Sequence, residues 1–153
     1  MSGGRAPDTE RMTQREIEVL AEQECYDLLA QVAVGRLIYT DDQGPAAVPV
    51  NCSLHGRDLL MRVHGGAKAA AVQQAVIGFE ADHIDNDQRA GWSVLVRGAA
   101  RVVPQSEVAA LLSEHRGQFP RPWAEGVHNV WLQLVPTLVT GRRLGAERVP
   151  LAL

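Results

Sequence analysis

A strand-to-helix turn in the middle of the chain carries the residues that best fit a chemical role. Gly65 and Gly66 end a strand pattern, and Lys68 stands at the start of an alanine-rich helix pattern. Glycines let a backbone approach a ligand closely, the first turn of a helix offers free N–H groups, and a lysine adds positive charge. These are the parts of a phosphate site. An ordinary turn with a surface lysine is the alternative, although Lys68 is the single lysine among 15 basic residues.

A second candidate is the segment Pro49-Val50-Asn51, which lies within an alternating strand pattern. A proline cannot donate a hydrogen bond to a neighbouring strand, so it marks a strand edge or a place where another group meets the backbone. Asn51 is predicted on the same face as Pro49. An edge strand with a polar outer face is the alternative interpretation.

A third candidate is the start of a long strand pattern, where Trp92, Ser93 and Val94 follow a glycine. A tryptophan at this position packs on a cofactor ring, on a partner subunit, or into the core. No side chain is assigned a proton-transfer role, and His64, directly before the two glycines, is the nearest catalytic candidate.

Other known constellations are missing from the sequence. There is no G-x-G-x-x-G, H-E-x-x-H, C-x-x-C or G-x-S-x-G motif, and no metal site is predicted. The acidic stretch from Asp82 to Asp87 is interpreted as a solvated strand end. Cys25 and Cys52 are far apart with no neighbouring base, so we expect reduced thiols in a cytoplasmic protein.

Composition limits the partners. The formal net charge is −3, which argues against nucleic acid, because duplex binding needs an excess of Lys and Arg. No segment approaches the ~20 apolar residues of a membrane span. We expect one domain over residues 14–147, a disordered tail over 1–13 and a short C-terminal tail over 148–153.

The hydrophobic pattern predicts the elements that position these residues. A helix starts at a capping box at Thr13, or only near Glu22 after an extended lead-in, and ends by Gly35. Strands are predicted at Arg36–Thr40, Ala46–Leu54, Leu59–His64, Val76–His83, Trp92–Val103, Asn129–Val135 and Leu138–Leu144, and short helices at Lys68–Ala75 and Ser106–Arg116. Six or seven strands with mostly short connections predict a mainly β antiparallel barrel with peripheral helices.

Seven short segments occur in order across about residues 15–145. They are Glu24–Leu29, Val34–Leu37, Val48–Asn51, Val63–Lys68, Phe79–Asp82, Gly91–Gly98 and Val139–Arg143. In this order and spacing they resemble the flavin-binding split-barrel family, the pyridoxamine 5′-phosphate oxidase-like superfamily. The similarity is greatest to its short bacterial members, some of which are nitroimidazole-resistance-like proteins.

The resemblance implies a split barrel that forms a homodimer, with two FMN sites in clefts between the subunits. It implies that the strand containing Pro49, Val50 and Asn51 runs along the isoalloxazine ring. The turn from His64 through Gly65 and Gly66 to Lys68 would hold the ribityl phosphate, and Trp92, Ser93 and Val94 would contribute, from the partner subunit.

The implied function is an FMN-dependent oxidoreductase acting on a small molecule. Similar barrels also bind deazaflavin F420 or haem, so a non-catalytic protein that binds or sequesters a cofactor is the alternative. Pyridoxamine phosphate oxidases proper carry a C-terminal signature containing histidine, and the matching region, Trp131 to Arg143, has none. We therefore do not expect pyridoxamine phosphate to be the substrate.

Overall fold

A computed structural model describes residues 16–64, 74–114 and 129–146. The predicted tails over 1–13 and 148–153 lie outside these residues, as do the capping box at Thr13 and residues 68–73 of the predicted helix at Lys68–Ala75. The elements in chain order are β1 (Glu16–Val19), α1 (Glu22–Leu29), β2 (Val34–Asp41), β3 (Gly44–His55), β4 (Asp58–His64), β5 (Ile77–Asp85), β6 (Ala90–Val102), α3 (Gln105–Glu114) and β7 (Asn129–Ala146).

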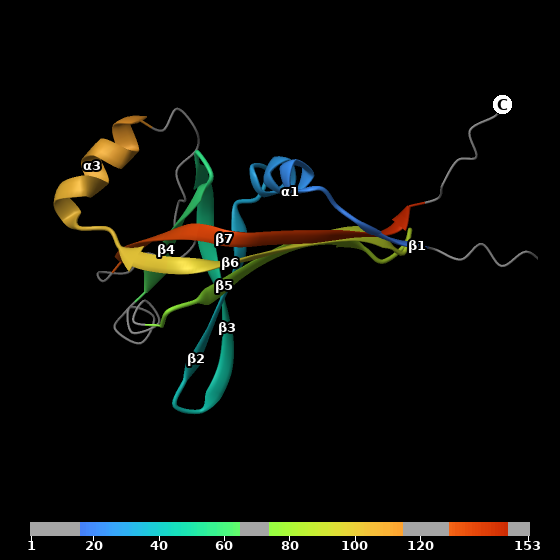
Figure 1. Ribbon diagram of the computed structural model, residues 1–153, viewed down its shortest axis with the longest axis horizontal. Coiled ribbons are helices and arrows are strands. Elements are labelled where there is room, and N and C mark those ends of the chain that lie inside the picture. Colours follow the sequence, from blue (N-terminus) through green and yellow to red (C-terminus); the bar gives the residue numbers. More distant parts are fainter. Residues whose placement is uncertain (1–15, 65–73, 115–128, 147–153) are drawn as a thin grey trace, which may run out of the picture.

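The seven strands form one antiparallel sheet in the order β1-β7-β4-β3-β2-β5-β6, and a further pairing of β7 with β6 closes it into a ring. This confirms the mainly β barrel predicted from the pattern of short connections. In Figure 1 the β2–β3 hairpin projects from the rest of the sheet, and the long β6 and β7 strands run together toward β1. Because β7 pairs with β1, β4 and β6, it joins the two sides of the barrel.

The end of the chain differs from the prediction, because one continuous strand, β7, replaces the two strands expected there. Pro136 does not break it, because the β6–β7 register shifts between Arg97 and Gly98, and Gly98 pairs with Pro136. A Cβ on Gly98 would lie 2.9 Å from the carbonyl carbon of Val135, so the glycine permits this close approach. A bulge of this kind absorbs the proline without ending the strand.

The first helix is also shorter than the longest prediction. It begins at Glu22, after the extended lead-in β1, which was one of the two alternatives. It ends at Leu29, so Gly35 belongs to β2 and not to a helix end. Gly35 has a packing role, because a Cβ there would lie 2.6 Å from Cε2 of Phe79.

The core fills the inside of the ring. Alternate strand residues point inward, and the largest fully buried side chains include Phe79, Leu37, Met61 and Leu132. The buried face of α1 packs onto this core, whereas α3 packs on the outside of the barrel wall, over a separate apolar cluster at Leu60. No helix in the described part of the chain is long and apolar enough to cross a membrane.

Candidate functional site

The β3 candidates divide between the two faces of the barrel wall. Pro49 and Asn51 face outward, whereas Val50 is only 4% exposed and packs in the core. In the strand register, Pro49 lies opposite Arg36 of β2. Asn51 lies between Val34 of β2 and Arg62 of β4. Any contact of Val50 with an outside ligand would therefore go through its backbone.

The barrel wall separates beside Pro49. Pairing between β3 and β4 stops at Asn51, while β4 continues to His64 paired with β7 alone. The N–H of Cys52 donates to the carbonyl of Ala33 on the β2 side at 3.0 Å. Because strand groups alternate in direction, the nitrogen of Pro49 faces the β4 side, where no strand in the described part of the chain is paired with it. Among the described residues Pro49 therefore lies at a locally unpaired position of β3, as one of the two interpretations of this proline predicts.

Two polar residues that the sequence interpretation did not select lie on the outward face next to Asn51. Arg62 is opposite Asn51 in the β3–β4 register, and Ser53 is two residues further along β3. The Nε atom of Arg62 and the Oγ atom of Ser53 are buried with no hydrogen-bond partner among the described residues. Because unpaired buried donors are costly, such atoms point to a missing ligand. One feature of the sequence could have indicated Arg62, namely its position two residues before His64, where the predicted phosphate turn begins.

The surroundings of Arg62 restrict what it can bind. Its guanidinium lies over the ring of Trp131, 5.5 Å from the centroid. Trp131 is its cross-strand neighbour on β7 and belongs to the cluster under α3. The aromatic face fixes the flat guanidinium while its unpaired donor stays available, an arrangement suited to phosphate or carboxylate. The phosphate candidates Gly65, Gly66 and Lys68 follow directly but lie outside the described residues.

The β6 candidates also divide by face. Ser93 faces outward, Val94 is completely buried, and Trp92 is partly buried against the core. The Oγ of Ser93 donates to Oε1 of Glu80 at 3.3 Å, and Oε2 of the same carboxylate accepts from Nη1 of Arg36 at 2.7 Å. The hydrogen bond with Glu80 is the main cause that raises the pKa of Arg36, with nearby Asp82 adding to it.

The β3 and β6 candidates lie on opposite sides of β2 and β5. In the closed ring, β3 and β6 are three strands apart in either direction. Pro49 lies opposite Arg36, and the carboxylate of Glu80 joins Arg36 to Ser93. Three strand spacings of about 4.8 Å separate β3 from β6 by about 14 Å along this row. The two groups of candidates therefore lie at opposite ends of one polar row on the outward face.

Thiol and metal chemistry have no support in the described residues. Cys25 and Cys52 are free and buried, as expected. Burial raises the pKa of Cys52 to about 12, and burial also raises that of Cys25, so neither thiol is activated as a nucleophile at neutral pH. Asp85 accepts the backbone N–H groups of Asp87 and Gln88, both at 3.0 Å, so it caps a turn. Residues 16–64, 74–114 and 129–146 contain no cluster able to hold a metal.

The site residues fit a flavin nucleotide. Its phosphate requires a cation and hydrogen-bond donors, and the unpaired Nε of Arg62 and Oγ of Ser53 are groups of this kind. Its flat ring requires a strand face with few obstructing side chains and free backbone groups, which the open edge at Pro49 offers. Fold and site together define a split β-barrel with candidate cofactor-binding residues on its outer wall.

The chain belongs to the pyridoxamine 5′-phosphate oxidase-like family. The family model described as pyridoxamine 5′-phosphate oxidase matches residues 21–143. An uncharacterized protein of Mycobacterium tuberculosis is 32% identical over 139 residues, which cover 87% of this chain and 89% of that protein. The family resemblance that the sequence segments indicated is thereby confirmed.

Solved structures agree with the fold. The chain is 33% identical to an FAD-binding protein from Mycobacterium smegmatis, with a TM-score of 0.61 and coverage of 84% of this chain and 98% of that one. It is also similar in fold to an FAD-binding protein from Mesorhizobium loti, with a TM-score of 0.69, 22% identity, and coverage of 87% and 99%. The barrel, a closed ring of six strands with β1 paired to β7, is therefore the split-barrel fold of this family.

Proposed function

We propose that this protein binds a flavin nucleotide, FMN in the simplest case, and uses it as a flavin-dependent oxidoreductase of a small molecule. The observation that carries the proposal is the pair of unpaired buried atoms, Arg62 Nε and Ser53 Oγ, beside the open edge at Pro49. The 33%-identical FAD-binding protein supports a flavin, since FAD contains the same ring and ribityl phosphate as FMN.

In this proposal the residues of β3 and β4 have separate roles. Arg62 and Ser53 bind the ribityl phosphate, together with Lys68 and the backbone of Gly65 and Gly66. Pro49 and Asn51 lie along the isoalloxazine ring, where Asn51 fixes its orientation. When bound, the flavin supplies the electron transfer, and the chain binds it, orients it and excludes water. His64 stays a candidate for moving a proton.

We also propose that two copies assemble around each flavin. Within one chain β2 and β5 separate Ser93 from Pro49 and Asn51, and a second copy packed on this face would bring its own Ser93 to the ring held by Asn51. An exposed apolar row supports such an assembly. The row crosses four neighbouring strands on the outward face and contains Ile17, Leu144 and Ile84, with Gly91 between the last two. The three apolar side chains are 61%, 38% and 49% exposed, in that order. Their burial between copies would stabilise a dimer.

The chain lacks the histidine of the C-terminal substrate signature, which supports a substrate other than pyridoxamine phosphate. The two free, buried cysteines are compatible with a cytoplasmic location.

Purified protein titrated with FMN, FAD and riboflavin, and followed by flavin absorbance and fluorescence, tests the proposal. We expect saturable binding of FMN, and of FAD if the cleft extends beyond the phosphate. Absence of flavin from the purified protein together with no binding would refute it. Turnover with reduced nicotinamide or reduced F420 then separates an enzyme from the alternative. Tight flavin binding without electron transfer to any acceptor would indicate storage or sequestration.

A further inference from the structure

A second pocket lies on the outward face of the barrel where β2, β5 and β6 meet. It has a volume of about 300 Å³, and its lining includes Ile38, Thr40, Gln74, Gly78, Leu95 and Arg97. That volume is at the lower end for small-molecule sites. Among the described residues, none of those assigned to flavin binding lines this pocket.

Strand register explains why the wall is hollow at this point. Gly78 pairs with Ile38 of β2 on one side and with Arg97 of β6 on the other. A Cβ on Gly78 would lie 3.2 Å from the Cβ of Ile38. Because Gly78 has no side chain, Ile38 can pack against its backbone, and the pocket opens beside this contact. Ile38 and Leu95 add apolar surface, so the pocket can receive a flat hydrophobic group.

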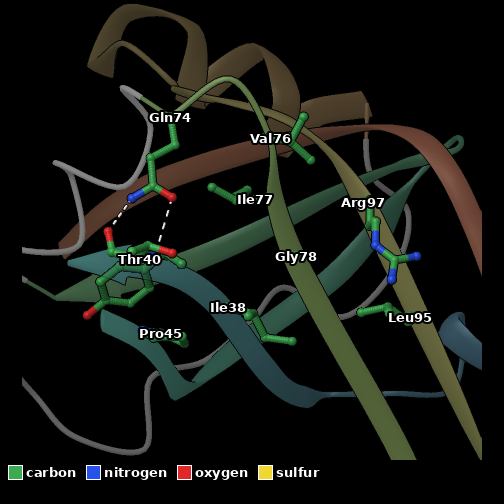
Figure 2. A pocket seen from close by; sticks show the side chains of 10 residues that line it. Ile38, Thr40, Pro45, Gln74, Val76, Ile77, Gly78, Leu95 and Arg97 are labelled. Carbon is green, nitrogen blue, oxygen red and sulfur yellow. Dashed lines mark hydrogen bonds between the residues drawn. The ribbon is translucent and has the colours of Figure 1, made fainter. Parts of the chain in front are cut away.

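The polar wall of the pocket already has its hydrogen bonds. Figure 2 shows the carboxamide of Gln74 facing the backbone of Thr40. Its Nε2 donates to the carbonyl of Thr40, and the N–H of Thr40 donates to its Oε1 at 3.2 Å. These two hydrogen bonds extend the hydrogen bonding along the edge of β2. They lie just beyond the last residue pair of β2 with β5, which is Ile38 with Gly78. Gln74 therefore shapes the wall and is satisfied without a ligand.

Arg97 is the group in the pocket that still has donors to offer. Its side chain is exposed on the far side of β5 from Gln74 (Figure 2). Within residues 16–64, 74–114 and 129–146 its guanidinium has no hydrogen bond or ion pair. By contrast, Arg36 is paired with Glu80 at 2.7 Å and Arg101 with Glu107 at 2.9 Å. An unpaired guanidinium beside apolar surface favours a carboxylate, which it can bind in bidentate geometry.

We propose that this pocket binds a small aromatic carboxylate. The ring packs against Ile38 and Leu95, and the carboxylate is held by Arg97. Arg97, the one charged residue in the described lining of the pocket, favours a ligand with one anionic end and an apolar body. This binding does not depend on a bound flavin.

Titration of the full chain with 2-naphthoate, followed by saturation-transfer NMR and by naphthoate fluorescence, tests the proposal. The neutral 2-naphthamide has the same ring without the charge. We expect naphthoate to bind more tightly than the amide, and Arg97→Gln to weaken naphthoate about tenfold with little effect on the amide. Arg101→Gln is the matched control, because it removes the same charge from the same strand and should change nothing.

A Leu95→Ala variant tests the apolar part, since it removes one of the two apolar side chains proposed to contact the ring. We expect it to weaken both compounds, with thermal melting and circular dichroism to verify the fold. If it does not fold, the Arg97→Gln comparison still decides. Equal binding of naphthoate and naphthamide, or no effect of Arg97→Gln, would overturn the proposal. Displacement of naphthoate by FMN would also overturn it, by showing that the pocket belongs to the flavin cleft.

Discussion

Replacing Arg62 with methionine should stabilise the empty protein and weaken its binding of FMN. The apolar methionine stem can still pack on Trp131, while the buried, unpaired Nε atom is removed. An unsatisfied buried donor costs about 1–3 kcal/mol, and the lost cation–π contact is worth about 0.5–1 kcal/mol. We therefore expect a net gain of about 1 kcal/mol, which raises the melting temperature by about 2–4 °C for a domain of this size.

Binding should change in the opposite direction. A charge-assisted hydrogen bond to phosphate contributes about 1.5–3 kcal/mol, so Arg62→Met should weaken FMN about 10- to 150-fold. Riboflavin has no phosphate, and its affinity should stay within about twofold of the wild-type value. Thermal melting of the empty protein and fluorescence titration with both flavins measure the two effects.

Arg57→Met is the matched control for this experiment. Arg57 also lies over an aromatic ring, 4.7 Å from the centroid of Tyr26, but it is ion-paired with Glu22 at 2.7 Å. Its replacement should not stabilise the protein and should leave both flavin affinities unchanged. The reasoning about Arg62 is refuted if its methionine variant is less stable when empty, or if FMN and riboflavin weaken equally.

Four further predictions concern the rest of the molecule. Lys68→Ala should weaken FMN at least tenfold more than riboflavin by fluorescence titration, and an equal loss for both would assign the lysine another role. Leu144→Glu, at the exposed apolar row, should convert a dimer into monomers in analytical ultracentrifugation, and an unchanged mass would place the assembly surface elsewhere. Gly35→Ala should destabilise the fold by about 1–3 kcal/mol in urea titrations, since its Cβ would lie 2.8 Å from the carbonyl oxygen of Glu80, and wild-type stability would contradict this packing. Burial raises the pKa of Cys52 from 9.0 to about 12. The stability that the buried neutral thiol contributes is therefore fully present below about pH 9 and is lost as the pH rises toward 12, because the thiol then ionises more readily in the unfolded chain. Unfolding free energy should fall by about 1 kcal/mol between pH 9 and pH 10, and Cys52→Val should lack that part of the loss.

Much of the fold could be predicted because local pattern and fold agree. Short connections between alternating segments allow only antiparallel neighbours, and this defines the order β2-β3-β4 and the pairing of β5 with β6. The joining of the last two predicted strands could not be predicted, because Pro136 is a strand breaker in sequence. It is tolerated only through the bulge opposite Gly98, a residue 38 positions earlier in the chain.

The candidate site was predicted unevenly for a similar reason. Pro49 and Asn51 were found because a proline inside a strand is a local signal of an open edge. Arg62 was missed, because an arginine in an alternating strand normally has an ordinary surface role. Its Nε is buried because Arg62 lies over Trp131 of β7 and opposite Asn51 of β3. These strands are far apart in the sequence, so the burial could not be predicted from it.

Sequence by itself determined the mainly β class, the open edge at Pro49 and the family to which the chain is similar, because strand alternation, proline chemistry and motif order are local properties. Tertiary structure alone decided which faces these residues occupy and how far apart they are. It placed Val50 and Val94 in the core, and Asn51 and Ser93 on strands that lie three positions apart round the ring. A closed ring separates residues according to strand order, which depends on pairings between distant segments and which no local pattern encodes.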